Sequence, residues 1–317
     1  MENFKNRTVL VTGGAGAIGS NLVKRLHKEE ANIIVLDNLS SGREDSIAGI
    51  PDVQFMNGSI TDDTVLEKIF SQPIDYVFHL AASFANQRSV EDPLRDLDVN
   101  GAGTIKLLQR SVKNGNIKRF VFSSSSCVYG NVDGIINENT AVHPETPYAI
   151  SKLAAENYVV FFHKYHALKS TTLRYFNSYG PGEYPGKYRN VIPNFFDLAM
   201  SGLPLPIMGT GEETRNFTFV SDIVDATIKS AVEEGAVGEC FNIGSNEEVR
   251  IKDLAKKING LSGNKAGVNF TERRKWDTIL KRILNYEKAK KLLDFNPKVG
   301  IEEGLKATYG WFLGSKK

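Results

Sequence analysis

Runs of apolar, often β-branched residues alternate with amphipathic helical patterns through the first half of this chain. Near-continuous apolar runs predict buried strands, and here they cover residues 8–12, 33–37, 53–56, 76–80, 119–123 and 171–175. Apolar positions three and four residues apart predict helices over residues 18–30, 94–113 and 147–166. The alternation predicts an α/β fold, a doubly wound parallel sheet with helices on both faces.

The pattern changes after Phe176. Residues 179–189 are rich in glycine, proline and tyrosine and predict a loop. Beyond this loop we expect short strands and helices over residues 191–201, 287–293 and 301–312. These elements predict a smaller C-terminal α+β lobe, some of whose strands or helices return to the first domain. Ligands of open α/β sheets bind at the carboxyl edge of the strands, so we place the lobe at that edge.

The composition narrows the range of functions. The 317 residues carry a net charge of +2, which gives no general attraction to nucleic acid or to an anionic membrane. No apolar run approaches the roughly 18 residues that span a bilayer, and residues 1–7 are too polar for a signal peptide. Cys127 and Cys240 make no disulfide framework, and the five histidines show no metal-ligand spacing. We therefore expect a cytoplasmic protein.

A glycine-rich turn joins the first strand to the first helix. Gly13, Gly16 and Gly19 allow a tight turn and close approach to a pyrophosphate, whose charge the helix start favours. Asp37 ends the second strand 18 residues after Gly19, where an acceptor for a ribose hydroxyl is expected. The alternative interpretation is that the three glycines and Asp37 only form turns and bind no ligand. Together these residues predict a Rossmann-type domain that binds NAD rather than NADP, although the nearby Arg43 keeps NADP open.

A second motif lies on the helix predicted over residues 147–166. Tyr148 and Lys152 are four residues apart and share one face of this helix. A neighbouring ammonium lowers the pKa of a tyrosine from its usual value of about 10, which would let Tyr148 act as a base. Ser123 to Ser126 close the preceding strand, where a hydroxyl can bond both Tyr148 and a substrate oxygen. Each feature alone is also typical of a surface pair or a strand end, but together with the glycine turn they predict redox chemistry at an alcohol carbon.

Further segments carry a resemblance to a known family. Besides the glycine turn and Tyr148-x-x-x-Lys152, they are Asp37-Asn38-Leu39-Ser40-Ser41-Gly42, His79-Leu80-Ala81-Ala82, Ser123-Ser124-Ser125-Ser126-Cys127-Val128-Tyr129-Gly130, Leu173-Arg174-Tyr175-Phe176-Asn177-x-Tyr179-Gly180-Pro181 and Thr214-Arg215-Asn216-Phe217. Together they resemble the extended short-chain dehydrogenase/reductases, and more narrowly the NAD-dependent nucleotide-sugar epimerases and dehydratases. The resemblance spans nearly the whole chain. It implies an NAD-binding Rossmann domain over residues 1–176 and a nucleotide-sugar-binding lobe over residues 177–317.

The resemblance implies roles for the residues at matching positions. Ser125, Tyr148 and Lys152 would be catalytic. The residues that would bind NAD are Gly13, Gly16, Ala17, Ile18, Asp37, Asn38, Ser41, Gly42, Ser59, Ile60, Leu80, Ala81, Ala82, Asn100, Ser123, Tyr148, Lys152 and Phe176. The residues that would bind the substrate are Ser125, Tyr148, Asn177, Asn190, Val191, Arg215, Arg274 and Asp277. Two arginines suit a diphosphate because a guanidinium can bond it bidentately.

Departures from the family's patterns bear on the reaction. Ser126 and Cys127 stand where the 4,6-dehydratases carry an acid pair, and Cys127 stands where uronate decarboxylases carry a glutamate. The resemblance therefore implies epimerisation at C4 of a UDP-sugar of the UDP-glucose/UDP-galactose type, through a 4-keto intermediate. The alternatives are 4-epimerisation of a uronate or an N-acetylhexosamine, another nucleotide-sugar modification such as reduction or dehydration, and a non-catalytic dinucleotide sensor. Ser59 also departs from the family, which usually has Asp at this position. The segment Arg274-Lys275-Trp276-Asp277 departs from the family's usual Arg-Pro-Gly-Asp.

The resemblance also implies a partner and a sugar preference. A homodimer would form through the helices over residues 94–113 and 147–166, and the second helix carries surplus apolar residues: Leu153, Tyr158, Val159, Phe161 and Phe162. Lys281 follows Asp277 by four residues, where related enzymes bound the sugar pocket. We expect Lys281 to favour an acidic or purely hydroxylated sugar over an N-acetylhexosamine; a solvated lysine is the alternative.

Overall fold

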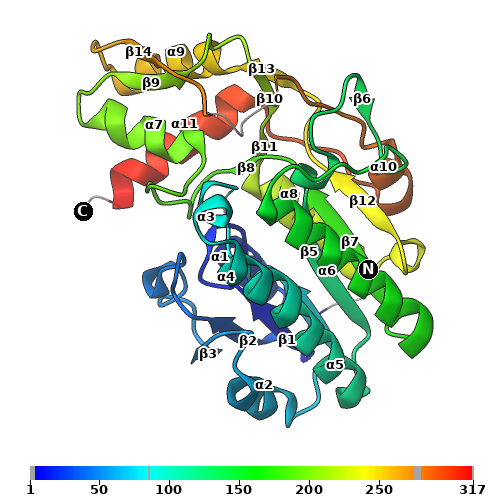
Figure 1. Ribbon diagram of the computed structural model, residues 1–317. Helices are drawn as coiled ribbons and strands as arrows, with labels where there is room; N and C mark the ends of the chain where they lie inside the picture. The colour runs from blue at the N-terminus through cyan, green and yellow to red at the C-terminus, as the bar shows by residue number, and fades with distance from the viewer. Residues whose placement is uncertain (1–3, 85, 275–279, 316–317) are drawn as a thin grey trace.

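The computed structural model describes residues 4–84, 86–274 and 280–315. Its main sheet has seven strands in the order β12-β7-β5-β4-β1-β2-β3, and all neighbours pair in parallel (Figure 1). These strands are β1 Thr8–Thr12, β2 Asn32–Asp37, β3 Val53–Asn57, β4 Tyr76–His79, β5 Arg119–Ser125, β7 Ser170–Tyr175 and β12 Cys240–Ile243. The predicted doubly wound parallel sheet is confirmed.

Helices cover both faces of this sheet. On one face pack α1 Ala17–Lys28, α8 Val220–Val232 and α10 Glu287–Leu293. On the other face pack α2 Asp63–Phe70, α5 Thr104–Asn114 and α6 Pro147–His166. Successive side chains of a strand point to opposite faces, so Val9 and Val11 join the first core and Leu10 joins the second. This double burial explains why the strands read as continuous apolar runs.

The helix predicted over residues 94–113 is interrupted in the structure. It consists of α4 Pro93–Leu97, a π-helical segment Asp98–Gly103 and α5, and it follows the short helix α3 Asn86–Glu91. Two glycines lie in the π-helical segment, and glycine has weak helix propensity. The Thr104 hydroxyl also donates to the backbone carbonyl of Asn100 at 2.6 Å, within the turn. π-Helical segments often accompany functional sites, and this one places Asn100 in the buried interior.

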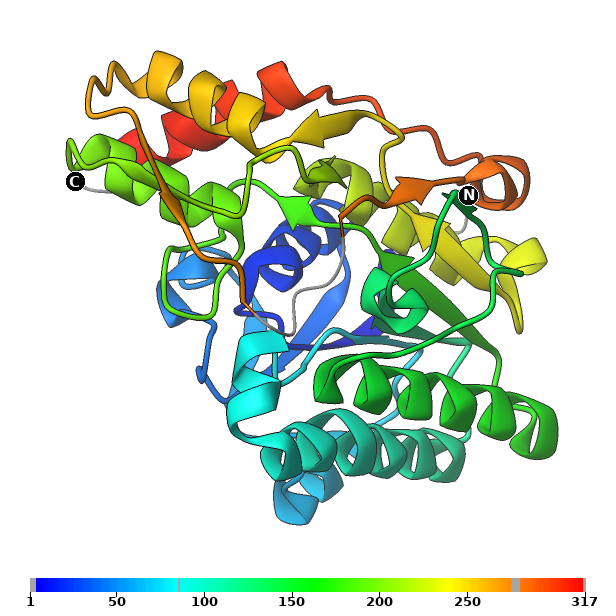
Figure 2. The ribbon, with the colours of Figure 1, turned by 45° about the horizontal axis from the view of Figure 1, so that its top comes forward.

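The second half of the chain builds a lobe at the carboxyl edge of the sheet (Figure 2). Its core joins α7 Val191–Met200, α9 Ile251–Ser262 and α11 Ile301–Ser315. Short strands pair as β9 Leu205–Met208 with β14 Val268–Thr271, β10 Thr214–Asn216 with β13 Glu248–Arg250, β8 Ser178–Tyr179 with β11 Thr218–Phe219, and β6 Ile135–Ile136 with β15 Ile283–Leu284. Single 3₁₀ turns cover Glu44–Ser46, Ser126–Tyr129 and Glu234–Ala236.

Two elements of the second half return to the main sheet. Strand β12 pairs with β7 at the sheet's edge, and α8 packs against α1. The division of the chain at residue 176 therefore stays a prediction. Within the described ranges, no helix is both long enough and apolar enough to cross a membrane.

Candidate active site

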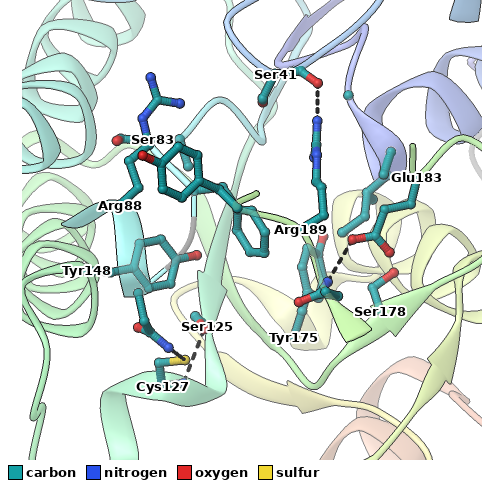
Figure 3. Close-up of a pocket in the computed structure, with 18 of the residues that line it drawn as sticks. Ser41, Ser83, Arg88, Ser125, Cys127, Tyr148, Tyr175, Ser178, Glu183 and Arg189 are labelled. Atoms are coloured by element: carbon teal, nitrogen blue, oxygen red, sulfur yellow. Dashed lines mark hydrogen bonds between the residues drawn. The ribbon is translucent and has the colours of Figure 1, made fainter. Parts of the chain in front are cut away.

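A pocket of about 570 Å³ lies where the carboxyl edge of the sheet meets the lobe (Figure 3). It gathers residues from distant parts of the chain. The predicted residues that line it are Gly13, Gly16, Ala17, Ile18, Asp37, Asn38, Ser41, Ser59, Ile60, Leu80, Ala81, Ala82, Ser123, Ser125, Tyr148, Lys152, Asn177, Asn190, Val191, Arg215 and Arg274. The glycine turn and the Tyr–Lys motif, 135 residues apart from Gly13 to Tyr148, thus share one pocket.

The glycine turn has the geometry of a phosphate cradle. Gly13 has a φ of +71°, and a side chain there would come within 2.7 Å of the Ala81 amide nitrogen. Gly16 is the N-cap residue of α1 and makes no side-chain hydrogen bond. The first N–H groups of this helix are therefore not capped by the side chain of the N-cap residue. Free N–H groups at a helix start, together with the helix dipole, bind phosphate. The turn therefore fits the pyrophosphate of a dinucleotide.

Asp37 lies in the pocket at the end of β2. Its carboxylate accepts hydrogen bonds from the backbone N–H groups of Ala15 at 3.0 Å and Leu39 at 2.8 Å. Burial raises the pKa of Asp37, and these two bonds oppose that rise. Arg43, the residue that kept NADP open as a cofactor, places its guanidinium carbon 4.3 Å from the centre of the Tyr184 ring. The carboxylate is thus held where the resemblance places the adenosine ribose.

The charge of Asp37 gives a prediction about the cofactor. We expect the apoprotein to bind NAD roughly tenfold or more tightly than NADP, because a 2′-phosphate beside this carboxylate is repelled. Asp37→Asn should reduce the difference between the affinities for NAD and NADP. Calorimetric titration of the apoprotein with each nucleotide measures both effects, and equal affinities for the wild type would contradict the argument.

The Tyr–Lys motif is positioned by the start of α6. Thr146 caps this helix by accepting from the Ala149 N–H at 3.3 Å, and Pro147 occupies its first turn. Tyr148 and Lys152 follow one turn apart, both buried. The Lys152 ammonium lies 4.4 Å from the centre of the Phe122 ring.

Ser125 connects the strand end to Tyr148. Its oxygen accepts from the Cys127 N–H at 3.1 Å, and its side chain lines the same pocket as Tyr148. Figure 3 shows Ser125 and Cys127 next to the Tyr148 ring. A hydroxyl and a phenol that line one pocket next to each other can both reach one substrate oxygen.

The electrostatics differ from the expectation. We expected Lys152 to lower the pKa of Tyr148, but burial is the largest influence and raises that pKa. The nearby Ser125 hydroxyl opposes this rise in the pKa of Tyr148 but does not reverse it. Burial also lowers the pKa of Lys152 to about 8, while Glu156 and Asp96 oppose that change.

Three predicted cofactor residues do not line the pocket. Gly42 packs against Ala15, and Phe176 is fully buried in the core. Asn100 accepts from the Ser83 N–H at 2.8 Å, and its amide also reaches Ser151 and Asp96, each at 3.1 Å. Asn100 therefore holds Ser83, which lines the pocket, and does not line the pocket itself. Asp277 lies outside the described residues.

The prediction for Lys281 is wrong in its placement. Its ammonium pairs with Glu248 at 3.2 Å and more than half of its side chain is exposed. The neighbouring Arg282 lines the pocket instead.

Sequence reasoning missed four pocket-lining residues of the loop after β8, namely Glu183, Lys187, Tyr188 and Arg189. Gly180 and Gly182 have positive φ, and the loop folds back so that the Pro181 carbonyl accepts from the Asn21 amide at 2.8 Å. Glu183 thereby lines the pocket, where burial raises its pKa to about 7 and the Asn190 amide donates to it at 2.9 Å. Arg189 also lines the pocket and donates to the Ser41 carbonyl. The signal available in the sequence was the presence of charged residues in a loop rich in glycine and proline.

Arginines gather at the lobe side of the pocket. Arg215 on β10 donates to the carbonyls of Thr214 at 2.8 Å and Leu280 at 3.4 Å, and Arg273 and Arg274 line the same pocket. Several guanidinium groups around one space suit a diphosphate. In the part of the chain that the structure describes, no group of three or more His, Cys, Asp or Glu side chains could hold a metal ion.

Comparison with known proteins decides the family. Residues 9–244 match the model of the NAD dependent epimerase/dehydratase family. The chain belongs to this family. Membership confirms the resemblance seen in the sequence and NAD as the cofactor.

Individual members of the NAD-dependent epimerase/dehydratase family align over nearly the whole chain. An epimerase structure from Methanothermobacter thermautotrophicus is 46% identical, with a TM-score of 0.97, and covers 99% of this chain and 94% of its own. A UDP-glucose 4-epimerase with UDP-glucose from Thermotoga maritima is 38% identical, with a TM-score of 0.94, and covers 98% and 100%. A UDP-N-acetyl-alpha-D-glucosaminuronate decarboxylase from Bacillus cytotoxicus is 34% identical over 96% of this chain and 97% of its own. Members of similar identity thus differ in reaction and sugar.

Proposed function

We propose that this enzyme epimerises C4 of a UDP-sugar of the gluco/galacto type through a 4-keto intermediate. The observation that carries the proposal is that Ser125, Tyr148 and Lys152 line one pocket together with the glycine turn, with no acid on the adjoining turn of Ser126 and Cys127. Bound NAD supplies a reversible hydride acceptor. The chain supplies the base, the substrate anchor and a closed pocket.

The residues of the site divide the proton transfer between them. Tyr148 accepts the proton of the C4 hydroxyl as the hydride leaves C4, which gives a ketone. Ser125 holds the same oxygen, and the side chain of Lys152 lines the pocket one helical turn from Tyr148 on α6. The proton returns from Tyr148 to the oxygen when hydride returns to the opposite face of C4, which gives the epimer. No atom is gained or lost over the cycle.

Epimerisation requires the sugar to turn while the nucleotide stays fixed. Arg215 and Arg274 suit the diphosphate, and Asn177, Asn190 and Val191 line the same pocket. Binding energy concentrated on the nucleotide leaves the sugar free to rotate. Dehydration and decarboxylation would each need an acid at Ser126 or Cys127, where the chain has a hydroxyl and a thiol.

The function is tested with a panel of nucleotide sugars. The purified enzyme is incubated with UDP-glucose, UDP-glucuronic acid and UDP-N-acetylglucosamine, and with the matching dTDP-, GDP- and CDP-sugars, and the products are separated chromatographically. We expect 4-epimers from the UDP-sugars with the first two preferred. Loss of water or of carbon dioxide, or no product from any UDP-sugar, would overturn the proposal.

We further propose a homodimer, which gives a prediction about mass. Large apolar side chains are exposed along α4 and along one stripe of α6: Leu94, Leu97, Ile150, Tyr158, Phe161 and Tyr165. An exposed apolar stripe of this size marks a protein interface. We expect a dimer by sedimentation at micromolar concentration, lost in Leu97→Glu and kept in Leu313→Glu, an exposed residue of α11. A monomeric wild type would contradict this.

A further inference from the structure

The loop of residues 180–190, between β8 and α7, leaves the lobe and rests on the helix that follows the glycine turn. The Pro181 carbonyl accepts from the Asn21 amide of α1 at 2.8 Å. At Gly182, whose φ is +93°, an added Cβ would lie 3.1 Å from the Ser20 hydroxyl oxygen. One end of the loop is therefore packed closely on the helix whose start fits the pyrophosphate of a dinucleotide.

Arg189, near the other end of the loop, reaches the same turn. Its Nη2 donates to the Ser41 carbonyl (Figure 3). The segment that carries Ser41 is held on the glycine turn, because the Arg43 N–H donates to the Ala15 carbonyl at 3.1 Å. Burial raises the pKa of Asp37, and the positive charge of Arg189 is among the influences that oppose this rise. The guanidinium of a lobe residue thus lies beside two residues, Asp37 and Ser41, for which the resemblance implies contacts with NAD.

The loop also spans the pocket to α3. Glu91 of α3 accepts from the Tyr188 hydroxyl at 2.6 Å and from the Lys187 ammonium at 3.1 Å. Lys187, Tyr188 and Arg189 all line the pocket. A loop that is bonded to α1, to residue 41 and to α3 therefore closes over the glycine-turn side of the pocket.

The glycine turn offers N–H groups to a pyrophosphate but no cation, because residues 13–19 carry no charged side chain. The nearby carboxylate of Asp37 adds negative charge on the same side. A guanidinium has five N–H donors and binds phosphate oxygens through charge-assisted hydrogen bonds, so Arg189 can hold both the Ser41 carbonyl and a phosphate.

We propose that Arg189 is a cofactor-binding residue contributed by the lobe, and that its guanidinium binds the pyrophosphate of NAD opposite the glycine turn. The side chain reaches the segment packed on Ala15, which favours the cofactor's phosphates over those of the substrate. Bound NAD then holds the loop of residues 180–190 against the first domain.

The test measures ligand binding. The apoproteins of wild type, Arg189→Met, Arg189→Lys and Arg250→Met are titrated calorimetrically with NAD and NADP, and the NAD-loaded proteins are titrated with UDP. Arg189→Met should bind NAD about tenfold or more weakly, as expected for the loss of a hydrogen bond between charged groups. Arg189→Lys, which keeps the charge but not the fork, should recover part of the affinity. Arg250 is an exposed lobe arginine outside the pocket, so Arg250→Met should match wild type.

UDP affinity should stay unchanged, and NADP should lose the same factor as NAD. Unchanged NAD affinity in Arg189→Met would overturn the proposal. Weaker binding of UDP alone would assign Arg189 to the substrate's diphosphate, and weaker binding of NADP alone would assign it to a 2′-phosphate.

A measurement on the wild type covers the case in which Arg189→Met does not fold. Hydrogen exchange of the backbone amides of residues 183–190 should slow when NAD alone is added to the apoprotein. Exchange that NAD leaves unchanged would refute the closure of this loop over the cofactor. Neither experiment depends on which sugar the enzyme converts, so failure of the proposed function leaves the result for Arg189 intact.

Discussion

Tyr148→Phe is expected to lower kcat by about 10²- to 10⁴-fold, the range that general acid–base catalysis contributes. The change removes the proton acceptor and keeps the ring that packs 6.1 Å from Phe84. Bound NAD and thermal stability should therefore be retained. Turnover of a UDP-sugar by wild type and variant, with NAD content measured on the same samples, gives the result.

A matched control comes from the same helix. Tyr158 lies on α6 with its side chain substantially exposed, so Tyr158→Phe makes the same chemical change outside the pocket. Its rate should equal that of the wild type. A Tyr148→Phe enzyme that keeps more than about a tenth of wild-type turnover would exclude Tyr148 as the base.

Glu156→Gln is expected to lower the free energy of unfolding by about 3–5 kcal/mol, the usual cost of removing one partner of a buried ion pair. Glu156 pairs with Arg174 at 2.7 Å with both side chains at most 10% exposed. It also accepts from the Ser124 hydroxyl at 2.5 Å. The variant leaves a buried guanidinium without its counter-charge. Urea unfolding of the two proteins measures the difference.

The comparison for this prediction is an exposed pair. Arg25 and Asp225 are 2.6 Å apart with more than a third of each side chain exposed, and such pairs contribute less than about 1 kcal/mol. Asp225→Asn should therefore lower the free energy of unfolding by less than about 1 kcal/mol. If Glu156→Gln lowers the free energy of unfolding no more than Asp225→Asn does, the buried pair of Glu156 and Arg174 does not stabilise the fold as we expect.

The elements with strong local signals could be predicted from the sequence. Helix α6 has its expected bounds because a Thr-Pro start and a residue in the left-handed conformation at Ala167 define both ends. The strands of the first half were predicted because burial on both faces makes them continuously apolar. The π-helical segment at Asp98–Gly103 leaves no such signal, since its residues fit an ordinary helical period.

The candidate site could be predicted where motifs fix the backbone and not where tertiary contacts do. The glycine turn, Asp37 and Tyr148 lie on elements whose geometry is local. Glu183 and Arg189 reach the pocket only because a loop folds back onto α1. The choice between Lys281 and Arg282 depends on a register that β15 sets by pairing with β6, about 150 residues earlier in the chain.

The position of β12 has a consequence for how the protein is made. The sheet's last strand is Cys240–Ile243, and it pairs with β7. A ribosome that adds roughly 5–20 residues per second needs roughly 12–50 s to reach it. Until then β7 presents an unpaired edge, and the space beside α1 lacks α8. The sheet of the dinucleotide-binding half therefore cannot be completed until most of the chain has been synthesised.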